Sequence, residues 1–479
     1  MPLAAHGAGE EVEMDGIERR RGDRSGPPGL YGVRNVVRFA TGQLPMLRSL
    51  ADQHGDIVRM KVLGGWWFLI SHPEDIETVA VKNARIMLRD DYTVVLQRAL
   101  GLGLLTSDGD LWKRQRKLMA QAFTPKRIAE YASAMVRVTD RALASWRHGE
   151  EINLHEEMSR VTMEVVADVL FGASISAADV GTVRESMETV NEFFANSPEA
   201  IAKLPAWVPT PRNRRFNRAV ARIEELIYSI IARRRSGEQR DDLLGTLLAA
   251  QDEGGAGMSD QQLRDESITL FLAGHETTAL ALAHTLYLLS KHPVVERRLF
   301  AELTSVLDGR LPSAEDVRSL PYTERVLKES MRLYPPAWTI GREAAEDLEV
   351  GGVHIPKGAQ ILMSQWVVHR DPRWFPNPEG FDPDRWEPER ARSLPRFAYF
   401  PFGAGPRICI GNHFAMMEAT LILAMIAQRY RVELLPNQRL DLKPSVTLRQ
   451  KGPGLRARII AREAERPAAV GPAEARVEA

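Results

Sequence analysis

The sequence predicts a mainly α-helical protein with small β-sheets, a fold of the α+β class. Two observations predict it. Between residues 108 and 334, nearly all of the start, stop and periodicity signals are helical. Strand-like patterns are confined to short stretches near the N-terminus and after residue 334. The chain has 479 residues, of which 44% are apolar, so it can bury a sizeable core.

Two stretches predict strands. Residues 56–71, DIVRMKVLGGWWFLIS, alternate between apolar and charged positions before an apolar aromatic run, and this predicts a small sheet near the N-terminus. Residues 348–363, LEVGGVHIPKGAQILM, place Gly351 and Gly352 between two apolar segments. This pattern predicts a β-hairpin with the two glycines at its turn.

Two helices stand out. A capping box formed by Ser259 and Gln262 opens a helix of about 30 residues, which stops before Pro293. A helix of this length must cross the whole molecule. A last helix begins near Gly411 and is apolar on most faces, which predicts that it is buried on all sides.

The composition is that of an ordinary globular protein. Lys plus Arg and Asp plus Glu number 63 each, so we expect no nucleic-acid partner, and we find no signal peptide or membrane anchor. The single cysteine can form no internal disulfide, which favours a reducing compartment, and we expect a cytoplasmic protein. We also expect one catalytic domain at 29–462 between disordered tails at 1–28 and 463–479.

The single cysteine, Cys409, lies in the glycine-rich loop FGAGPRICIG, residues 402–411. Its glycines let the backbone bend tightly and approach a flat or bulky group. A helix is expected to begin directly after the cysteine, and its N–H groups and dipole should favour the thiolate, which is a good soft metal ligand. A lone buried cysteine is otherwise most often a small apolar residue. On composition alone the apolar role is favoured, so both roles stay open at this point.

Three further motifs lie on predicted helices. In AGHETT, residues 273–278, a glycine and two threonines are poor helix formers at a helix centre, and a threonine hydroxyl there can bond the carbonyl four residues back. Glu329 and Arg332 share one helix face, as do Trp112 and Arg116 one turn apart. Each pair alone also fits a solvated helix face.

Taken together, the motifs resemble those of one family. Five loop residues match F-x-x-G-x-R-x-C-x-G, the heme-binding loop of the cytochrome P450 superfamily: Phe402, Gly405, Arg407, Cys409 and Gly411. The order of the other motifs agrees along residues 28–462. The resemblance implies the cytochrome P450 fold, a triangular prism with a long central helix and a loop that carries the cysteine ligand. It also implies heme b, iron protoporphyrin IX, as cofactor, with Cys409 as the iron ligand.

The resemblance implies roles for the residues around that cofactor. Thr277 would hydrogen-bond the dioxygen substrate, Glu276 would relay protons towards it, and His275 would be structural. The propionates would be held by Trp112, Arg116 and Arg342. The other cofactor contacts would come from Ala273, Phe402, Gly403, Arg407 and Gly411.

A structural cluster is also implied. Glu329, Arg332 and Arg385 would form a buried group that locks the loop carrying the cysteine. Trp386 follows Arg385 at a position where phenylalanine is commoner in the family. This departure leaves the arginine unaffected.

The substrate pocket is expected to be lipophilic. By position in the family it would draw on Leu105, Ala273, Ala337, Trp338 and Thr339, with Val446 and Thr447 as weaker candidates. Residues 191–215 mix apolar residues with prolines and are predicted to form a lid. Fatty acids, terpenoids and steroids all fit a pocket of this kind.

The resemblance implies a monooxygenase that uses O2 and electrons from separate donors, either a ferredoxin with its reductase or a flavodoxin-type protein. Lys113, Arg114 and Lys117 would receive an acidic donor, or they form an ordinary charged helix face. Two alternatives stay open. One is a family member that isomerises or dehydrates its substrate, and the other is a non-catalytic heme sensor. The intact pair of Glu276 and Thr277 counts against both.

Overall fold

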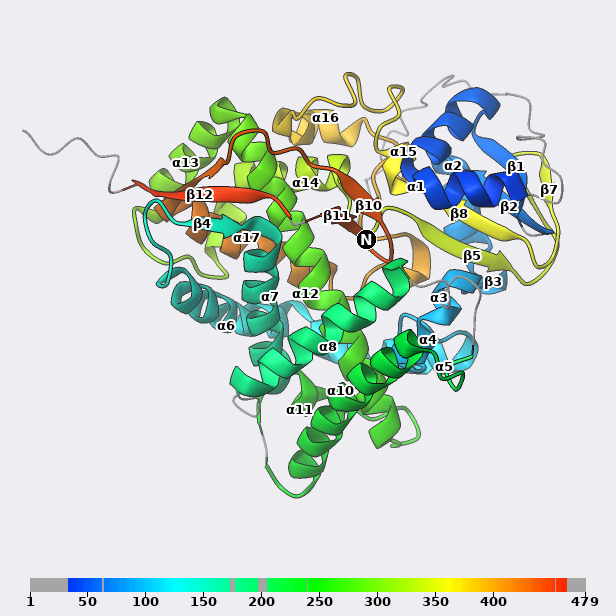
Figure 1. Cartoon of the computed structure of the whole chain (residues 1–479), viewed down its shortest axis with the longest axis horizontal. Helices are drawn as coiled ribbons and strands as arrows, with labels where there is room; N and C mark the ends of the chain where they lie inside the picture. Colours follow the sequence, from blue (N-terminus) through cyan, green and yellow to red (C-terminus); the bar gives the residue numbers. More distant parts are fainter. Residues whose placement is uncertain are drawn as a thin grey trace, which may run out of the picture.

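The computed structural model describes residues 33–62, 64–172, 177–196, 205–238, 240–452 and 454–462. The two predicted tails, 1–28 and 463–479, lie outside this part of the chain, as do residues 197–204 of the predicted lid. The described elements confirm the predicted fold class, because helices dominate and the strands form small sheets (Figure 1).

Helices and strands alternate unevenly along the chain. The helices are α1 (Val33–His54), α2 (Pro73–Glu77), α3 (Asp91–Val95), α4 (Gln97–Leu100), α5 (Gly109–Ala120), α6 (Pro125–Leu143), α7 (Leu154–Phe171), α8 (Ala177–Asn196), α10 (Pro211–Arg235), α11 (Leu243–Ala249), α12 (Asp260–Lys291), α13 (Pro293–Leu307), α14 (Pro321–Leu333), α15 (Gln365–Val368), α16 (Pro388–Arg392) and α17 (Asn412–Arg429). The strands are β1 (Ile57–Val62), β2 (Gly65–Ile70), β3 (Met87–Leu88), β4 (Glu151–Asn153), β5 (Ile340–Ala344), β6 (Leu348–Val350), β7 (Val353–Ile355), β8 (Gln360–Met363), β9 (Tyr430–Leu434), β10 (Leu442–Pro444), β11 (Leu448–Gln450) and β12 (Arg456–Ala461).

Helix α12 runs through the middle of the molecule, with α6, α7 and α17 on one side and the largest sheet on the other (Figure 1). The predicted capping box is present. The Ser259 hydroxyl accepts the Gln262 N–H at 3.2 Å, and Gln262 Oε1 accepts the Ser259 N–H at 3.0 Å. The helix is 32 residues long and ends just before Pro293, as predicted.

The largest sheet has five strands in the order β1-β2-β8-β5-β3. Strands β2 and β8 are parallel, and the other neighbours are antiparallel. Apolar side chains fill both faces, since Phe68 and Ile70 belong to one core cluster while Val58 and Leu69 belong to another beneath α1. The predicted N-terminal sheet is therefore confirmed, but β5 and β8 come from the C-terminal half of the chain.

Three smaller sheets complete the fold: β4-β12-β9, β6-β7 and β10-β11. The pair β6-β7 confirms the predicted hairpin, because Val350 lies opposite Val353 and both turn glycines have positive φ. Strand β4 interrupts a region predicted to be helical. It forms because β12, from the far end of the chain, supplies its hydrogen-bonding partner.

Helix α17 confirms the prediction of an all-round buried helix. Residues 421–426 are completely buried and belong to the core clusters that lie against α6, α7 and α12. Within the described residues, none of the helices is both long enough and apolar enough to cross a membrane.

Candidate active site

The cysteine loop depends on two glycines. Gly403 (φ 83°) and Gly405 (φ 65°) adopt left-handed backbone conformations, which side chains disfavour. A Cβ atom on Gly405 would lie 1.9 Å from the Ala80 carbonyl oxygen, so the loop packs directly against that backbone. The Cys409 N–H donates to the Phe402 carbonyl oxygen at 2.8 Å and closes the loop.

Cys409 faces a space inside the molecule. Its side chain is accessible, yet it lies deep enough that burial raises the pKa of its thiol. The Gly411 N–H and the Arg116 charge act in the opposite direction without outweighing burial. The expectation that the local environment favours the thiolate is therefore wrong for the protein alone, partly because α17 begins only at Asn412. A metal cation at the sulfur is what would ionise it.

The centre of α12 also has an accessible face. Ala273 is exposed although Leu272 and His275 beside it are 7% and 2% exposed, and Thr277 one turn later is half-buried. The Thr277 hydroxyl donates to the Ala273 carbonyl oxygen at 2.7 Å, which confirms the predicted bond to the residue four positions back. Because other elements surround α12, its accessible face indicates an internal space here as well.

Two buried arginines, Arg89 and Arg342, and the half-buried Arg407 lie close enough to influence one another. Burial lowers the pKa of all three, and the Arg342 and Arg407 charges lower that of Arg89 further. The pKa of Arg342 falls to about 10, first through burial and then through Arg407. Arg89 Nε has no hydrogen-bond partner among the described residues. Cations packed in this way favour an anionic group between them.

The residues fit the heme that the resemblance implies. The sulfur is accessible inside the protein, and the arginine cluster suits two carboxylates. Trp112 belongs with this cluster, because the Arg407 guanidinium lies 4.2 Å above its ring. Arg407 also binds Asp108 and donates to the Ser107 carbonyl oxygen at 3.1 Å.

Arg116 contacts the cysteine loop, and its predicted role at a propionate stays a prediction. Its Nη1 donates to the Ile408 carbonyl oxygen at 2.9 Å, and its charge acts on Cys409. Arg116 therefore supports the cysteine loop, whereas Arg89 lies with Arg342 in the arginine cluster. The sequence analysis missed Arg89, because nothing local distinguishes a buried arginine from an exposed one.

The predicted structural cluster is brought together. Glu329 and Arg332 are both completely buried, and Arg332 Nε and Nη2 donate to the two Glu329 oxygens at 2.9 and 2.8 Å. Arg385 Nε donates to Glu329 Oε1 at 3.2 Å. Arg332 also donates to the carbonyl oxygens of residues 369, 378 and 380. The cluster thus ties α14 to the segment that leads to the cysteine loop.

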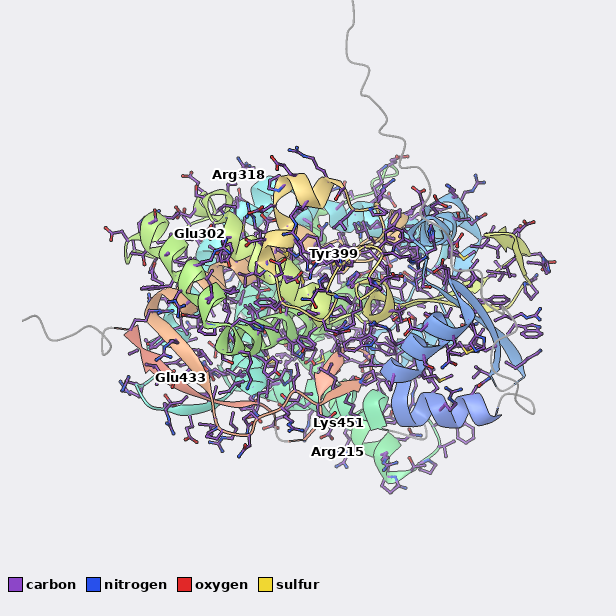
Figure 2. All side chains as sticks on the ribbon, turned by 90° about the horizontal axis from the view of Figure 1, so that it is seen from above. Arg215, Glu302, Arg318, Tyr399, Glu433 and Lys451 are labelled. Atoms are coloured by element: carbon purple, nitrogen blue, oxygen red, sulfur yellow. The ribbon has the colours of Figure 1, made fainter. Side chains whose placement is uncertain are left out.

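Trp386 is part of this cluster. Its indole N–H donates to Glu329 Oε2 at 3.0 Å, a bond that phenylalanine cannot make. Its ring centroid lies 4.3 Å from that of Tyr399, whose hydroxyl donates to the Lys328 carbonyl oxygen at 3.0 Å. Figure 2 shows Tyr399 well inside the outline of the molecule, with Arg318 and Glu433 nearer its edge. Trp386, at a position where phenylalanine is commoner in the family, therefore adds a hydrogen-bond donor to the buried Glu329 carboxylate.

Glu276 is held by residues from two other elements. Its Oε1 accepts from Arg449 Nε of β11 at 2.7 Å and from the Thr447 hydroxyl at 3.4 Å, and it lies 3.7 Å from His155 Nε2 of α7. His275 Nδ1–H donates to the Phe271 carbonyl oxygen at 2.7 Å, a contact within α12. The sequence analysis found neither Arg449 nor His155. His155 lies more than a hundred residues before Glu276 in the chain, and Arg449 lies more than a hundred residues after it.

The predicted substrate residues do not all share one environment. Leu105 and Val446 are half-buried and pack against the same apolar cluster, while Ala337 and Thr339 are also half-buried. Trp338 contradicts the prediction, because its ring is 4% exposed in the core cluster beneath α1 and its N–H donates to the Ser445 carbonyl oxygen. It is packed as a core residue because both its ring and its N–H are satisfied there.

One of the three cations predicted to receive an electron donor is already bound within the protein. Arg114 Nε pairs with Asp252 at 2.7 Å, and its Nη2 donates to the Ala256 and Gly257 carbonyl oxygens, so this side chain anchors a loop of its own protein. Lys113 and Lys117 stay exposed and are paired with exposed carboxylates. Only these two lysines remain accessible to a partner.

Comparison with known proteins identifies relatives along the whole fold. A sequence model described as Cytochrome P450 matches residues 25–455. Cyclooctatin synthase of Streptomyces melanosporofaciens is 40% identical over 428 residues, which are 88% of this chain and 92% of that protein. Cyclooctat-9-en-7-ol 5-monooxygenase of the same organism is 38% identical, over 82% of this chain and 86% of that protein. Pentalenene oxygenase of Streptomyces avermitilis is 35% identical, over 83% and 88%.

Solved structures of other proteins superpose on nearly the whole of this chain. The cytochrome P450DA heme domain superposes with a TM-score of 0.81 at 26% identity, covering 91% of this chain and 97% of that one. Retinoic acid-bound cyanobacterial CYP120A1 superposes with a TM-score of 0.80 at 28% identity, covering 91% and 99%.

Proposed function

The chain belongs to the cytochrome P450 family, and from this premise we propose that Cys409 holds heme b as its iron ligand. The protein is a heme-dependent monooxygenase that places one oxygen atom of O2 into a lipophilic substrate. The observation that carries the assignment of Cys409 is its accessible sulfur deep within the protein, inside the glycine-rich loop. Heme b is supported by the arginine cluster, which suits two propionates.

The heme, when bound, supplies the activation of dioxygen that allows a C–H bond to be oxidised. In the overall reaction a C–H bond becomes C–O–H, and the second oxygen atom leaves as water. This balance consumes two protons and two electrons, and the electrons come from redox proteins. The protein contributes binding, orientation, exclusion of water and a proton route.

The residues of α12 would handle the protons. We propose that the Thr277 hydroxyl, released from the Ala273 carbonyl, hydrogen-bonds the dioxygen substrate. Glu276, directly before it, would carry protons to this hydroxyl from the side where His155 lies. Arg89, Arg342 and Arg407 would pair with the propionates and fix the ring, and Arg116 would hold the Cys409 loop.

Among fatty acids, terpenoids and steroids, we propose a terpenoid substrate. Two relatives are named for pentalenene and cyclooctat-9-en-7-ol, which by their names are cyclic, unsaturated compounds. Leu105 and Val446, from two distant segments, are half-buried apolar side chains that pack against one core cluster, and such side chains suit a hydrocarbon substrate. Product formation from pentalenene, compared with laurate and a steroid, would decide among the classes.

We also propose a ferredoxin with its reductase, or a flavodoxin-type protein, as electron donor. Such donors are acidic, and Lys113 and Lys117 are the exposed cations of α5 on the side of the cysteine loop. A cytoplasmic location is proposed from the single cysteine, which suits a reducing compartment.

The test is the absorption spectrum of the reduced, carbon monoxide-treated holoprotein. With Cys409 as ligand, the Soret band should show the thiolate-type red shift, and Cys409→Ser should lose that band and all product formation, because a neutral hydroxyl is a poor ligand and donor. Ser133→Ala, which alters an exposed side chain of α6, serves as the control. A histidine-type band in the unmodified protein would overturn the assignment.

A further inference from the structure

Three consecutive charged residues on α12 lie in the protein interior. Arg264, Asp265 and Glu266 are 5%, 4% and 0% exposed, and the reaction proposed above uses none of them. Charged side chains are rarely buried without partners, because the loss of their hydration must be offset. Arg264 Nη2 donates to the Ala99 carbonyl oxygen of α4 at 3.2 Å, so the first of the three residues contacts the segment that leads from α4 to α5.

The two carboxyl groups hold the backbone of the loop that follows α4. Asp265 Oδ2 accepts the Leu102 N–H at 2.8 Å, and Glu266 Oε2 accepts the Leu104 N–H at 3.0 Å. A buried backbone N–H without a partner is destabilising, so these two bonds determine how residues 101–105 lie on α12. Glu266 Oε1 has no hydrogen-bond partner in the described part of the chain, so this side chain contributes the bond to Leu104.

Two glycines allow the loop to approach α12 closely. A Cβ atom on Gly101 would lie 2.2 Å from Asp265 Oδ1, and a Cβ atom on Gly103 would lie 2.2 Å from Thr269 Oγ1. Gly101 also has a left-handed backbone conformation, with a φ of 58°. The loop backbone therefore packs directly against α12, and hydrogen bonds from the helix fix it without an intervening side chain.

The turn at residues 103–106 determines where Leu105 lies. The Thr106 N–H donates to the Gly103 carbonyl oxygen at 3.0 Å, which makes Leu104 and Leu105 the two central residues of the turn. The Leu104 carbonyl oxygen accepts from Arg89 Nη2 at 3.1 Å, while the Leu104 N–H is held from α12. Because both polar groups of Leu104 are bound, the central peptide of the turn cannot rotate, and the direction of the Leu105 side chain is set.

We propose that Glu266 is a positioning residue for substrate specificity, which fixes the turn that carries Leu105 at the wall of the substrate pocket. The inference rests on the proposed function, in which Leu105 contacts the substrate. Glu266 itself is completely buried behind the turn and acts through Leu104. Without its bond the Leu104 N–H would be buried and unpaired, so the turn would rearrange and Leu105 would move. The shape of the pocket would change while the heme stays in place.

The shape of the pocket can be measured without turnover, by titrating the ferric holoenzyme with imidazole and with 4-phenylimidazole. Both bind heme iron through a ring nitrogen, but only the larger ligand reaches the pocket wall. Glu266→Leu, which removes the acceptor of the Leu104 N–H, should change the ratio of the two dissociation constants at least about fivefold. An unchanged ratio would overturn the proposal. Glu266→Met, which keeps the length of the side chain, replaces Glu266→Leu if the leucine variant does not bind heme.

Two controls separate the hydrogen bond from a general loss of packing. Burial, with a smaller contribution from the Asp265 charge, raises the pKa of Glu266 to about 8, so at neutral pH most of the bond is accepted by an uncharged carboxyl. Glu266→Gln reproduces that acceptor and should keep the ratio within about twofold of wild type. Ser267→Ala should do the same, because the neighbouring Ser267 hydroxyl is completely buried and has no partner among the described residues.

A double-mutant cycle tests whether Glu266 acts through Leu105. Leu105→Ala alone should change the ratio, and adding Glu266→Leu to it should change the ratio by less than about twofold more, because the side chain that Glu266 positions is then absent. An equal effect of Glu266→Leu in both backgrounds would overturn the proposal. An unchanged ratio in Leu105→Ala would refute the pocket role of Leu105 on which the inference rests.

Hydrogen exchange of the backbone amides gives a second readout on the ferric holoenzyme. The Leu104 amide should exchange at least about tenfold faster in Glu266→Leu than in wild type, and at the wild-type rate in Glu266→Gln. Equal rates in all three proteins would show that Glu266 does not hold the turn. A thiolate-type carbon monoxide band in each variant shows that the heme site is intact, so a failure here is distinct from a failure of the proposed function.

Discussion

Thr277 uses its hydroxyl within its own helix, where it donates to the Ala273 carbonyl oxygen. This bond weakens the helical ladder at the point where α12 has its accessible face. The hydroxyl can exchange this partner for another at small cost, because it remains half-buried. The Thr277 hydroxyl is therefore able to bind a polar ligand at the accessible face of α12.

Replacing Thr277 by Ala should lower the amount of product formed per electron consumed several-fold and raise peroxide release, because the proposed proton route loses its last hydroxyl. The measurement compares reductant use, peroxide and product in one assay. Thr285→Ala is the matched control, since Thr285 makes the same bond to Ala281 at 2.6 Å two turns further along α12. Equal coupling in Thr277→Ala and wild type would remove Thr277 from the route.

Glu418 on α17 is a buried carboxyl outside the relay. It is completely buried, and neither oxygen has a hydrogen-bond partner within the described part of the chain. Burial raises its pKa to about 8, against a smaller opposing effect of Thr278. The folded protein therefore keeps this proton to a higher pH than the unfolded chain, whose carboxyl has an ordinary pKa.

This pKa predicts a pH-dependent stability. Between the ordinary pKa and about 8, folding takes up a proton at Glu418, so its contribution to stability is present at low pH and is lost as the pH rises through this window. Glu418→Gln lacks that proton uptake. Its stability relative to wild type should therefore increase by on the order of 1 kcal/mol per pH unit across the window.

Urea unfolding of the holoprotein at several pH values would measure the difference. Glu433→Gln, at a more exposed position on β9 near the edge of the molecule in Figure 2, is the control and should show no such trend. A constant difference between Glu418→Gln and wild type over the window would contradict the raised pKa.

At the scale of elements, the segment before the cysteine loop is fixed by one buried carboxylate. Glu329 on α14 accepts from two arginines, one indole and the Asp382 N–H, so its charge is shared by donors from both segments. Buried charges of this kind are costly to unpair. Removing one donor should therefore lower the stability of the whole loop region.

Trp386→Phe removes the indole donor and keeps most of the ring. It should lower the free energy of unfolding by about 1–3 kcal/mol, because the buried Glu329 carboxylate loses a hydrogen bond. Trp374→Phe is the matched control. Trp374 lies in the same apolar cluster, but its N–H is buried without a partner among the described residues. Chemical unfolding of the three holoproteins gives the comparison, and equal losses in both variants would show that the Trp386 bond contributes nothing.

At the scale of the whole molecule, the site depends on segments that lie far apart in the chain. The arginine cluster joins residues near positions 89, 342 and 407, and the contacts of Glu276 join α7, α12 and β11. Strand β12, near the end of the described chain, pairs with both β4 and β9. The core clusters likewise draw on residues from Leu44 to Ile459. The described chain from α1 to β12 therefore acts as one unit.

A chain of residues 29–462 should consequently fold and hold heme in the same amount per protein as the full chain. Its unfolding midpoint should agree with that of the full chain, because every core cluster of the described residues falls within these limits. Heme content and thermal unfolding measure this. Loss of heme or of cooperative unfolding would show that one of the excluded segments contributes to the domain.

Local sequence alone determined the long helix with its capping box, the hairpin at Gly351 and Gly352, and the glycine-rich loop around Cys409. Each depends on residues only a few positions apart, where helix periodicity and backbone conformation act directly. The Thr277 bond to Ala273 was predictable for the same reason. So was the shared helix face of Glu329 and Arg332.

The tertiary structure decided what these groups meet. Glu276 pairs with Arg449, Arg116 supports the cysteine loop, Trp338 lies in the core, and burial outweighs the helix terminus at the Cys409 thiol. Burial and ion pairing depend on which distant segments the fold brings together, and residue spacing does not encode those distances. The chemical character of the motifs could therefore be predicted from the sequence. The charge state of their side chains was set only by the packing of the folded chain.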